Sequence, residues 1–62
     1  MKAHTVEPGI LQPGDHVVAK NKDLTIKFIE GPDRNGAYDI YGIDQTGHDQ
    51  IVIVTDLVTL YM

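Results

Sequence analysis

Short segments in which apolar residues alternate with other residues follow one another along most of this chain, and they constrain its fold more than any other feature. In the clearest segment, residues 24–30, Leu24, Ile26 and Phe28 are separated by single polar residues. A spacing of two places these three side chains on one face of a β-strand. No segment has the apolar spacing of an amphipathic helix over three turns, and β-branched residues, Gly and Pro recur throughout. The sequence therefore predicts an all-β fold.

Turn-forming residues divide the chain into five expected strands. Pro13-Gly14 precedes the first strand, and the loop of residues 31–36 ends in Asn-Gly, a pair that accepts positive φ angles. Residues 1–9 have no periodicity, and we predict a flexible N-terminal arm there. Residues 10–62 are predicted to form one domain. The strands are expected at residues 16–20, 24–30, 37–44, 50–54 and 58–61.

The chain is short, with 62 residues, and it contains no cysteine. A disulfide and a cysteine-based zinc site are therefore excluded, and the domain must be stabilised by its apolar core, by a partner, or by both. No stretch approaches the about 20 apolar residues of a membrane helix. Residues 1–7 lack the apolar region of a signal peptide. We expect a soluble, cytoplasmic protein.

Two parts of the sequence carry a resemblance to a known group of folds. Residues 11–18, with the motif Pro-Gly-Asp followed by valines, and near the end the hairpin of residues 44–49 and residues 54–60 resemble SH3-like barrels, which include Tudor and KOW modules and small bacterial and phage proteins. The resemblance covers roughly residues 10–61 and implies a five-strand, partly open SH3-like barrel. Polyproline binding is not expected, because the chain has no Trp and its first loop has no aromatic residue. A methyl-lysine cage is not expected either, since the aromatic residues are few and Phe28 is assigned to the core.

The inventory of reactive side chains argues against catalysis. The chain has no Ser and no Cys, so neither a Ser-His-Asp nor a Cys-His arrangement can be built. Asp44 and Asp49 could form a carboxylate pair, but both flank a turn, where Asp is favoured for its hydrogen bonds to the backbone. We therefore predict that the protein is not an enzyme.

The histidines are the candidate metal ligands. His4 lies in the expected arm, His16 begins a strand and His48 lies in a hairpin loop. No spacing brings two of them to one face of a strand or a helix. We expect exposed histidines and no metal or other cofactor.

Charge is distributed unevenly along the chain. Acidic and basic residues cancel within residues 1–35, whereas residues 36–62 carry the whole net charge of −4. This balance opposes phosphate binding by the protein as a whole, and it also permits an inhibitor that mimics nucleic acid. As an alternative, a basic set interleaved with acidic residues could share one edge and bind nucleic acid. That set is Lys20, Lys22, Lys27 and Arg34.

The last strands contain more apolar side chains than one small core can use. Within residues 50–54, isoleucines alternate with valines, so both faces of this strand are apolar. Either the N-terminal segment with Val6, Ile10 and Leu11 covers the second face, or that face contacts a protein. A bulge at Gly42 would reverse which face is inward.

The interpretation we prefer is a non-enzymatic protein-interaction module that binds a partner or itself. The size, the acidity and the lack of catalytic groups would suit a small accessory or inhibitor protein. The resemblance implies an origin in a phage or another mobile element. Acidic residues around an apolar centre would suit a partner with a basic margin. The expected contacts are Tyr41, Ile43, Val52, Val54 and Tyr61, ringed by Asp39, Asp44 and Asp56.

Overall fold

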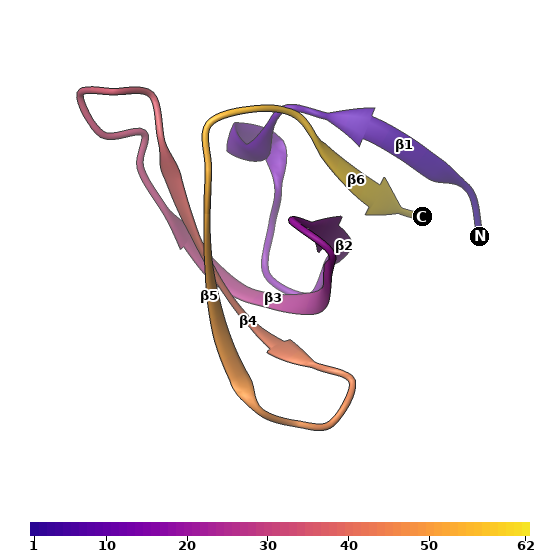
Figure 1. The fold of residues 1–62 in the computed structure, drawn as a ribbon. Helices are drawn as coiled ribbons and strands as arrows, with labels where there is room; N and C mark the ends of the chain where they lie inside the picture. Colours follow the sequence, from indigo (N-terminus) through magenta and orange to yellow (C-terminus); the bar gives the residue numbers. More distant parts are fainter.

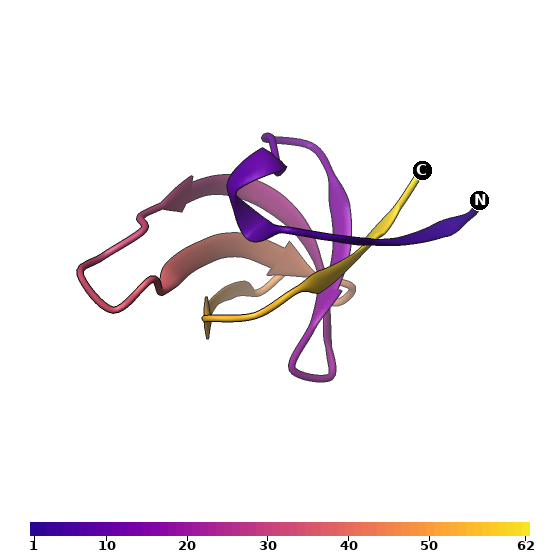
Figure 2. The same ribbon diagram turned by 90° about the horizontal axis from the view of Figure 1, so that it is seen from above.

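A computed structural model describes all 62 residues. The chain forms one antiparallel sheet of six strands. The strand order is β1-β6-β2-β3-β4-β5 and the sheet is not closed, so β1 and β5 are its two edges (Figure 1). Seen from above, the sheet curls around its own interior (Figure 2). The prediction of an all-β fold is confirmed. The elements are β1 (Ala3–Val6), the 3₁₀ turn η1 (Pro8–Ile10), β2 (His16–Ala19), β3 (Lys22–Glu30), β4 (Tyr38–Asp44), β5 (Asp49–Val54) and β6 (Val58–Tyr61).

The N-terminal segment forms a strand, where the sequence suggested a flexible arm. β1 pairs with β6 along its whole length, from Ala3 opposite Tyr61 to Val6 opposite Val58. This pairing explains why the sheet has six strands where five were expected. The one helical element is three residues long, and the chain has no helix with the length and hydrophobicity that crossing a membrane requires.

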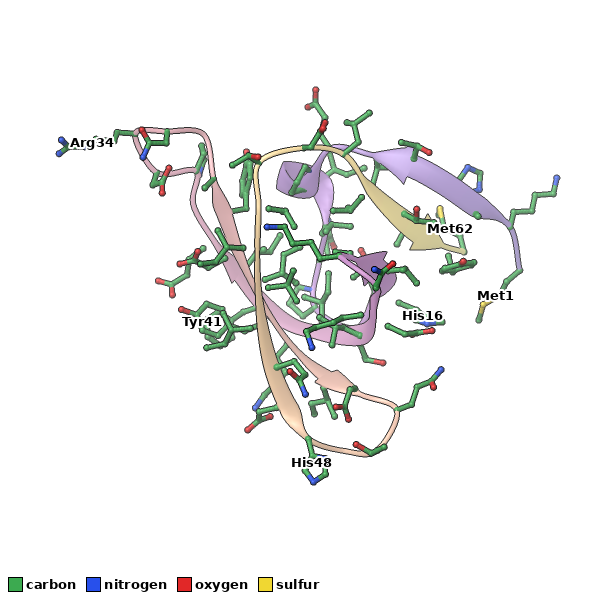
Figure 3. The ribbon with its side chains drawn as sticks, in the orientation of Figure 1. Met1, His16, Arg34, Tyr41, His48 and Met62 are labelled. Atoms are coloured by element: carbon green, nitrogen blue, oxygen red, sulfur yellow. The ribbon has the colours of Figure 1, made fainter.

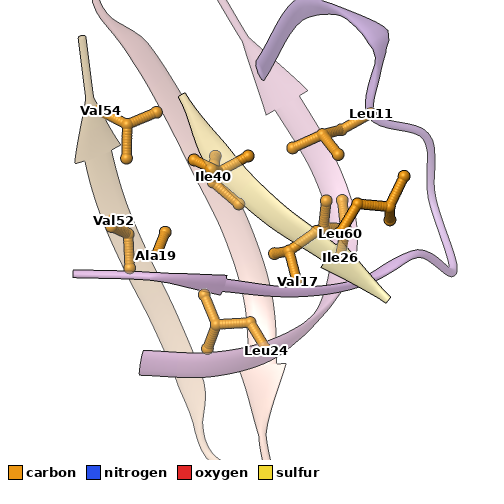
Figure 4. Packing of buried hydrophobic residues seen from close by; sticks show 10 residues of the cluster. Leu11, Val17, Ala19, Leu24, Ile26, Ile40, Val52, Val54 and Leu60 are labelled. Carbon is orange, nitrogen blue, oxygen red and sulfur yellow. The ribbon is translucent and has the colours of Figure 1, made fainter. Parts of the chain in front are cut away.

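The core lies inside the curled sheet and is built from aliphatic side chains of every strand except β1, together with Leu11 from the segment between η1 and β2. Val17, Leu24 and Ile40 are completely enclosed (Figure 4). Val52 and Val54 of β5 also belong to this core, so the prediction that they are exposed contacts is wrong. The ten core residues are Leu11, Val17, Ala19, Leu24, Ile26, Ile40, Val52, Val54, Val58 and Leu60.

A β-bulge in β3 decides which side chains leave the core. Ile26 is opposite Gly42 and Phe28 is opposite Tyr41, so Lys27 is an extra residue in β3. An extra residue reverses the alternation of faces. Phe28 therefore turns to the outer face, and its assignment to the core is corrected. The irregularity lies on β3, directly opposite the glycine at which a bulge was suspected.

The segment between β1 and β2 closes the core and leaves the outer face of the sheet uncovered. Leu11 is buried and Val6 packs against the core cluster, whereas Ile10 is exposed to solvent. The N-terminal segment thus contributes to the core itself. It does not cover the second apolar face of β4 and β5.

Candidate functional site

The outer face of β3, β4 and β5 carries a row of exposed apolar side chains. Phe28 is the register partner of Tyr41, and Tyr41 is the partner of Ile51, so the three lie side by side across three strands. Ile53 extends the row along β5. The exposed fractions are 46% for Phe28, 59% for Ile51 and 54% for Ile53. We call these four residues, Phe28, Tyr41, Ile51 and Ile53, the outer-face stripe.

The aromatic end of the stripe is ordered by stacking. The ring centroids of Phe28 and Tyr41 are 4.3 Å apart and their planes are 16° from parallel. A hollow of about 200 Å³ lies beside this pair, lined at its other side by Lys27, Asp49 and Ile51. Contiguous apolar surface of this kind on a small protein marks a contact site more often than scattered single residues do.

Carboxylates flank the stripe at one end without a cation. Glu30 and Asp39 are direct register partners on β3 and β4, and Asp39 is the partner of Ile53. Neither carboxylate forms an ion pair, although like charges directly opposite each other destabilise a sheet. The pKa of the Tyr41 phenol is raised by hydrogen bonding to Glu30, by desolvation, and by the charges of Glu30 and Asp39. This side of the stripe therefore carries two carboxylates that form no ion pair.

A single ion pair lies on the opposite side of the row Phe28–Tyr41–Ile51 from Glu30 and Asp39. Lys27 Nζ lies 3.3 Å from Asp49 Oδ1, and both side chains are exposed. An exposed pair of this type contributes little to stability, about 0–1 kcal/mol. Because Lys27 is paired with Asp49, the stripe has no free cation beside it.

The residues expected to form the contact surface are not brought together. Tyr41 and Ile43 lie on the outer face, while Val52 and Val54 point into the core. Tyr61 lies on β6, where its ring stacks on His16 with centroids 5.1 Å apart. Three stripe residues were not predicted as contacts: Phe28, Ile51 and Ile53. The two-sided apolar pattern of β5 indicated that one of its faces would be exposed, but not which one.

The basic residues proposed for nucleic acid do not form one patch. Lys20 and Lys22 flank the β2–β3 turn, Lys27 pairs with Asp49, and Arg34 lies at the tip of the β3–β4 loop (Figure 3). Lys22 is the first residue of β3 and Arg34 lies beyond its other end, so this nine-residue strand, at about 3.3 Å per residue, separates the two. Nucleic-acid binding stays a prediction, and it has no shared surface to support it.

Asp44 organises the β4–β5 hairpin. Its carboxylate accepts hydrogen bonds from Thr46 Oγ1 (2.6 Å), Thr46 N (2.9 Å), His48 N (3.0 Å) and Gln50 Nε2 (2.9 Å). These bonds, with that of the Thr46 hydroxyl contributing most, hold the pKa of Asp44 well below its ordinary value. An ionised carboxylate with four donors is a structural group and a poor general acid. Asp49, its suggested catalytic partner, is turned toward Lys27.

A polar groove of about 300 Å³ runs between the β2–β3 turn and the β4–β5 hairpin. Seven polar residues line it, among them Asp23, Asp44 and Gln45, and Gln45 Nε2 donates to Asp23 Oδ2 (3.2 Å). Asp23 also contacts the His16 ring. No three His, Asp or Glu side chains come together anywhere in the chain as a metal-binding set.

The comparisons with known proteins leave the interpretation to this geometry. No protein-family model matches the chain, and neither a curated protein nor a solved structure matches it. The outer-face stripe is the surface with the clearest unmet physical requirement, because it combines exposed apolar area with unpaired charge.

Proposed function

We propose that this protein is a non-enzymatic protein-interaction module that binds a partner protein through the outer-face stripe. The observation that carries the proposal is the unbroken apolar row from Phe28 through Tyr41 to Ile51. Burying such a row in a contact removes apolar area from water, which favours binding by about 25 cal/mol per Å² of buried apolar surface. Aromatic side chains with acidic neighbours are well suited to the centre and the rim of a protein contact.

We further propose that the domain is an SH3-like barrel with an added N-terminal strand. The support is the strand order β6-β2-β3-β4-β5, in which four consecutive strands form a meander and the last strand returns beside the first. The short break of residues 55–57 before β6 agrees with that arrangement. β1 would then be an addition on the far side of β6.

Binding to a protein is favoured over binding to nucleic acid by the charges around the stripe. Glu30 and Asp39 adjoin the apolar row, and the cation nearest to it, Lys27, is already paired with Asp49. Phosphates would be repelled by this surface. A small accessory or inhibitor protein is the role we propose for such a module.

The proposal is tested by capture from an extract of the native cells with the immobilised protein. Ile51→Asp places a charge in the stripe, whereas Leu57→Asp changes an equally exposed apolar residue (55% exposed) outside it. We expect the wild type and Leu57→Asp to capture the same protein and Ile51→Asp to lose it. Sizing of the pure protein shows whether a second copy is the occupant. Equal capture by both variants would remove the stripe as the contact site.

A further inference from the structure

We propose that the partner adds an extended strand to the free edge of β5, and that this strand alternates Lys or Arg with apolar residues. The inference rests on the proposed function and names the chemistry of the partner. Three features carry it: the open backbone of β5, the end of the apolar row at that edge, and the unpaired acids behind it.

The backbone of β5 has an unsatisfied edge. The Asp44 N–H donates to the His48 carbonyl (3.0 Å), which makes this a hydrogen-bonded pair at the start of the β4–β5 ladder. Such pairs alternate along an antiparallel ladder, so Val52 is again in a hydrogen-bonded position. The N–H and C=O groups of Ile51 and Ile53 therefore point away from β4, toward the open edge. They are free to pair with another strand.

This edge lacks the devices that protect exposed strands. β5 is six residues long and contains no Pro, no Lys and no bulge; its outer side chains are Asp49 at the hairpin end, whose charge is paired with Lys27, and then Ile51 and Ile53. Soluble proteins normally block such an edge with charge, Pro or a covering segment. The other edge, β1, has only four residues, and Ala3, His4 and Thr5 make its exposed part mostly polar. β5 is thus the edge with an unmet requirement for a partner.

The acids of the stripe specify which strand fits. A strand added to β5 would lie about 10 Å from β4, at about 4.8 Å per strand. A Lys or Arg side chain opposite Ile53 spans most of that distance, with its aliphatic part over Ile53 and its charge near Asp39. Glu30 lies one strand further in the same row. A basic side chain would relieve the opposition of these two carboxylates.

A second copy of this chain fits the same edge less well. β5 contains Asp49 and no cation, and residues 36–62 contain no Lys or Arg. Pairing two β5 strands would bring the two sets of Glu30 and Asp39 toward one another with nothing to neutralise them. Like-charge juxtaposition opposes association. We therefore assign the edge to a basic strand of another protein.

The test uses a capped peptide in which lysine and valine alternate, added to the ¹⁵N-labelled full chain. We expect chemical-shift changes centred on β5 and slower hydrogen exchange of the Ile51 and Ile53 amides. The matched control replaces every lysine by glutamate and should bind at least about tenfold more weakly. A second control uses two forms of the peptide, each N-methylated at alternate residues. Methylation keeps the side chains and removes the N–H donors on one edge of the peptide strand. Methylation on the edge that meets β5 should abolish binding, while methylation on the other edge should not.

Several results would overturn the inference. No binding at about 1 mM peptide would do so, as would equal binding of both N-methylated forms, or shifts centred on β1. Self-association that protects the Ile51 and Ile53 amides without peptide would assign the edge to a second copy. The outcome is separable from that of the proposed function. If the captured partner is lost with Ile51→Asp but is not displaced by the peptide, the stripe stands as the contact site and strand addition fails.

Discussion

The rings of Phe28 on β3 and Tyr41 on β4 stack nearly parallel on the outer face of the sheet, with centroids 4.3 Å apart. The pair exists because Lys27 is an extra residue in β3, which turns Phe28 away from the core. Without the bulge, Phe28 would lie on the same face as Leu24 and Ile26. One inserted residue thus converts a core position into the aromatic part of the stripe.

Removing the stack should cost stability that neither ring provides alone. We expect a double-mutant cycle of Phe28→Ala and Tyr41→Ala to give a coupling free energy of about 0.5–1.5 kcal/mol, the range for aromatic pairs. Urea denaturation of the four proteins measures it. The control cycle pairs Phe28→Ala with Tyr61→Ala, which lies on β6 and stacks on His16 instead. Coupling in both cycles, or in neither, would contradict the stacking.

The sequence was sufficient for the positions of five strands and insufficient for their faces. Turn residues and alternation mark β2 to β6 because these are local properties. Which face of β5 is inward depends on its register with β4, and isoleucine and valine are equally apolar, so the local pattern is silent there. Val52 and Val54 were therefore placed on the wrong face. β1 was missed because its pairing with β6 joins the two ends of the chain.

Gly42 should tolerate no side chain. A Cβ at this position would lie 2.7 Å from the Thr25 carbonyl oxygen and 3.2 Å from Leu24 Cβ, at the point where the bulge brings β3 close. We expect Gly42→Ala to lower the free energy of unfolding by about 1–3 kcal/mol, measured by urea denaturation. Gly36→Asn is the control, because its site is open and Asn accepts a positive φ. A Gly42→Ala protein as stable as the wild type would refute the close approach.

A charge on the inner face of β5 should lower stability strongly, whereas a charge on its outer face should change stability little. Val52 is buried in the core, so Val52→Asp buries an unpaired carboxylate and should cost several kcal/mol, enough to unfold a domain of this size. Ile51 is exposed, and Ile51→Asp should stay folded with a midpoint close to the wild type. Circular dichroism and urea denaturation distinguish the two. If Ile51→Asp unfolds and Val52→Asp does not, the assignment of faces is reversed.

The candidate site was predictable in kind and only partly in its residues. An excess of apolar residues in the last strands indicated an exposed apolar face, and Tyr41 and Asp39 were placed there correctly. Ile51 and Ile53 follow once the register of β5 is known. Phe28 could not be found from the pattern, because Lys27 carries no mark of a bulge in the sequence. The unpaired edge of β5 is a property of the whole sheet and has no local signal at all.

The Tyr41 phenol should report on the acids beside it. Its pKa is raised above the ordinary value, first by hydrogen bonding to Glu30 and further by desolvation and by Asp39. A folded pKa above the unfolded one means that this contribution is present below about pH 10 and is lost as the pH rises through the folded pKa. We expect Glu30→Gln to move the pKa of Tyr41 toward its ordinary value, followed by NMR titration of the labelled phenol carbons. Asp56→Asn should leave the Tyr41 titration unchanged, and an equal shift in both variants would exclude Glu30 as the cause.

Asp44 should make the protein sensitive to acid. Its folded pKa is depressed by the donors of Thr46, His48 and Gln50, so its contribution is complete above the ordinary Asp value of about 3.9 and is lost as the pH falls toward the lower folded pKa. Asp44→Asn keeps an acceptor oxygen for the hairpin amides and removes the charge. We expect this variant to be less stable than the wild type at neutral pH and to lose less stability on acidification. Urea midpoints at several values between about pH 6 and pH 2 test this.

Asp56→Asn is the matched control, because the Asp56 carboxylate accepts only the neighbouring Leu57 N–H. Its acid slope should equal that of the wild type, and an unchanged slope in Asp44→Asn would mean that the hairpin does not depend on the ionised carboxylate.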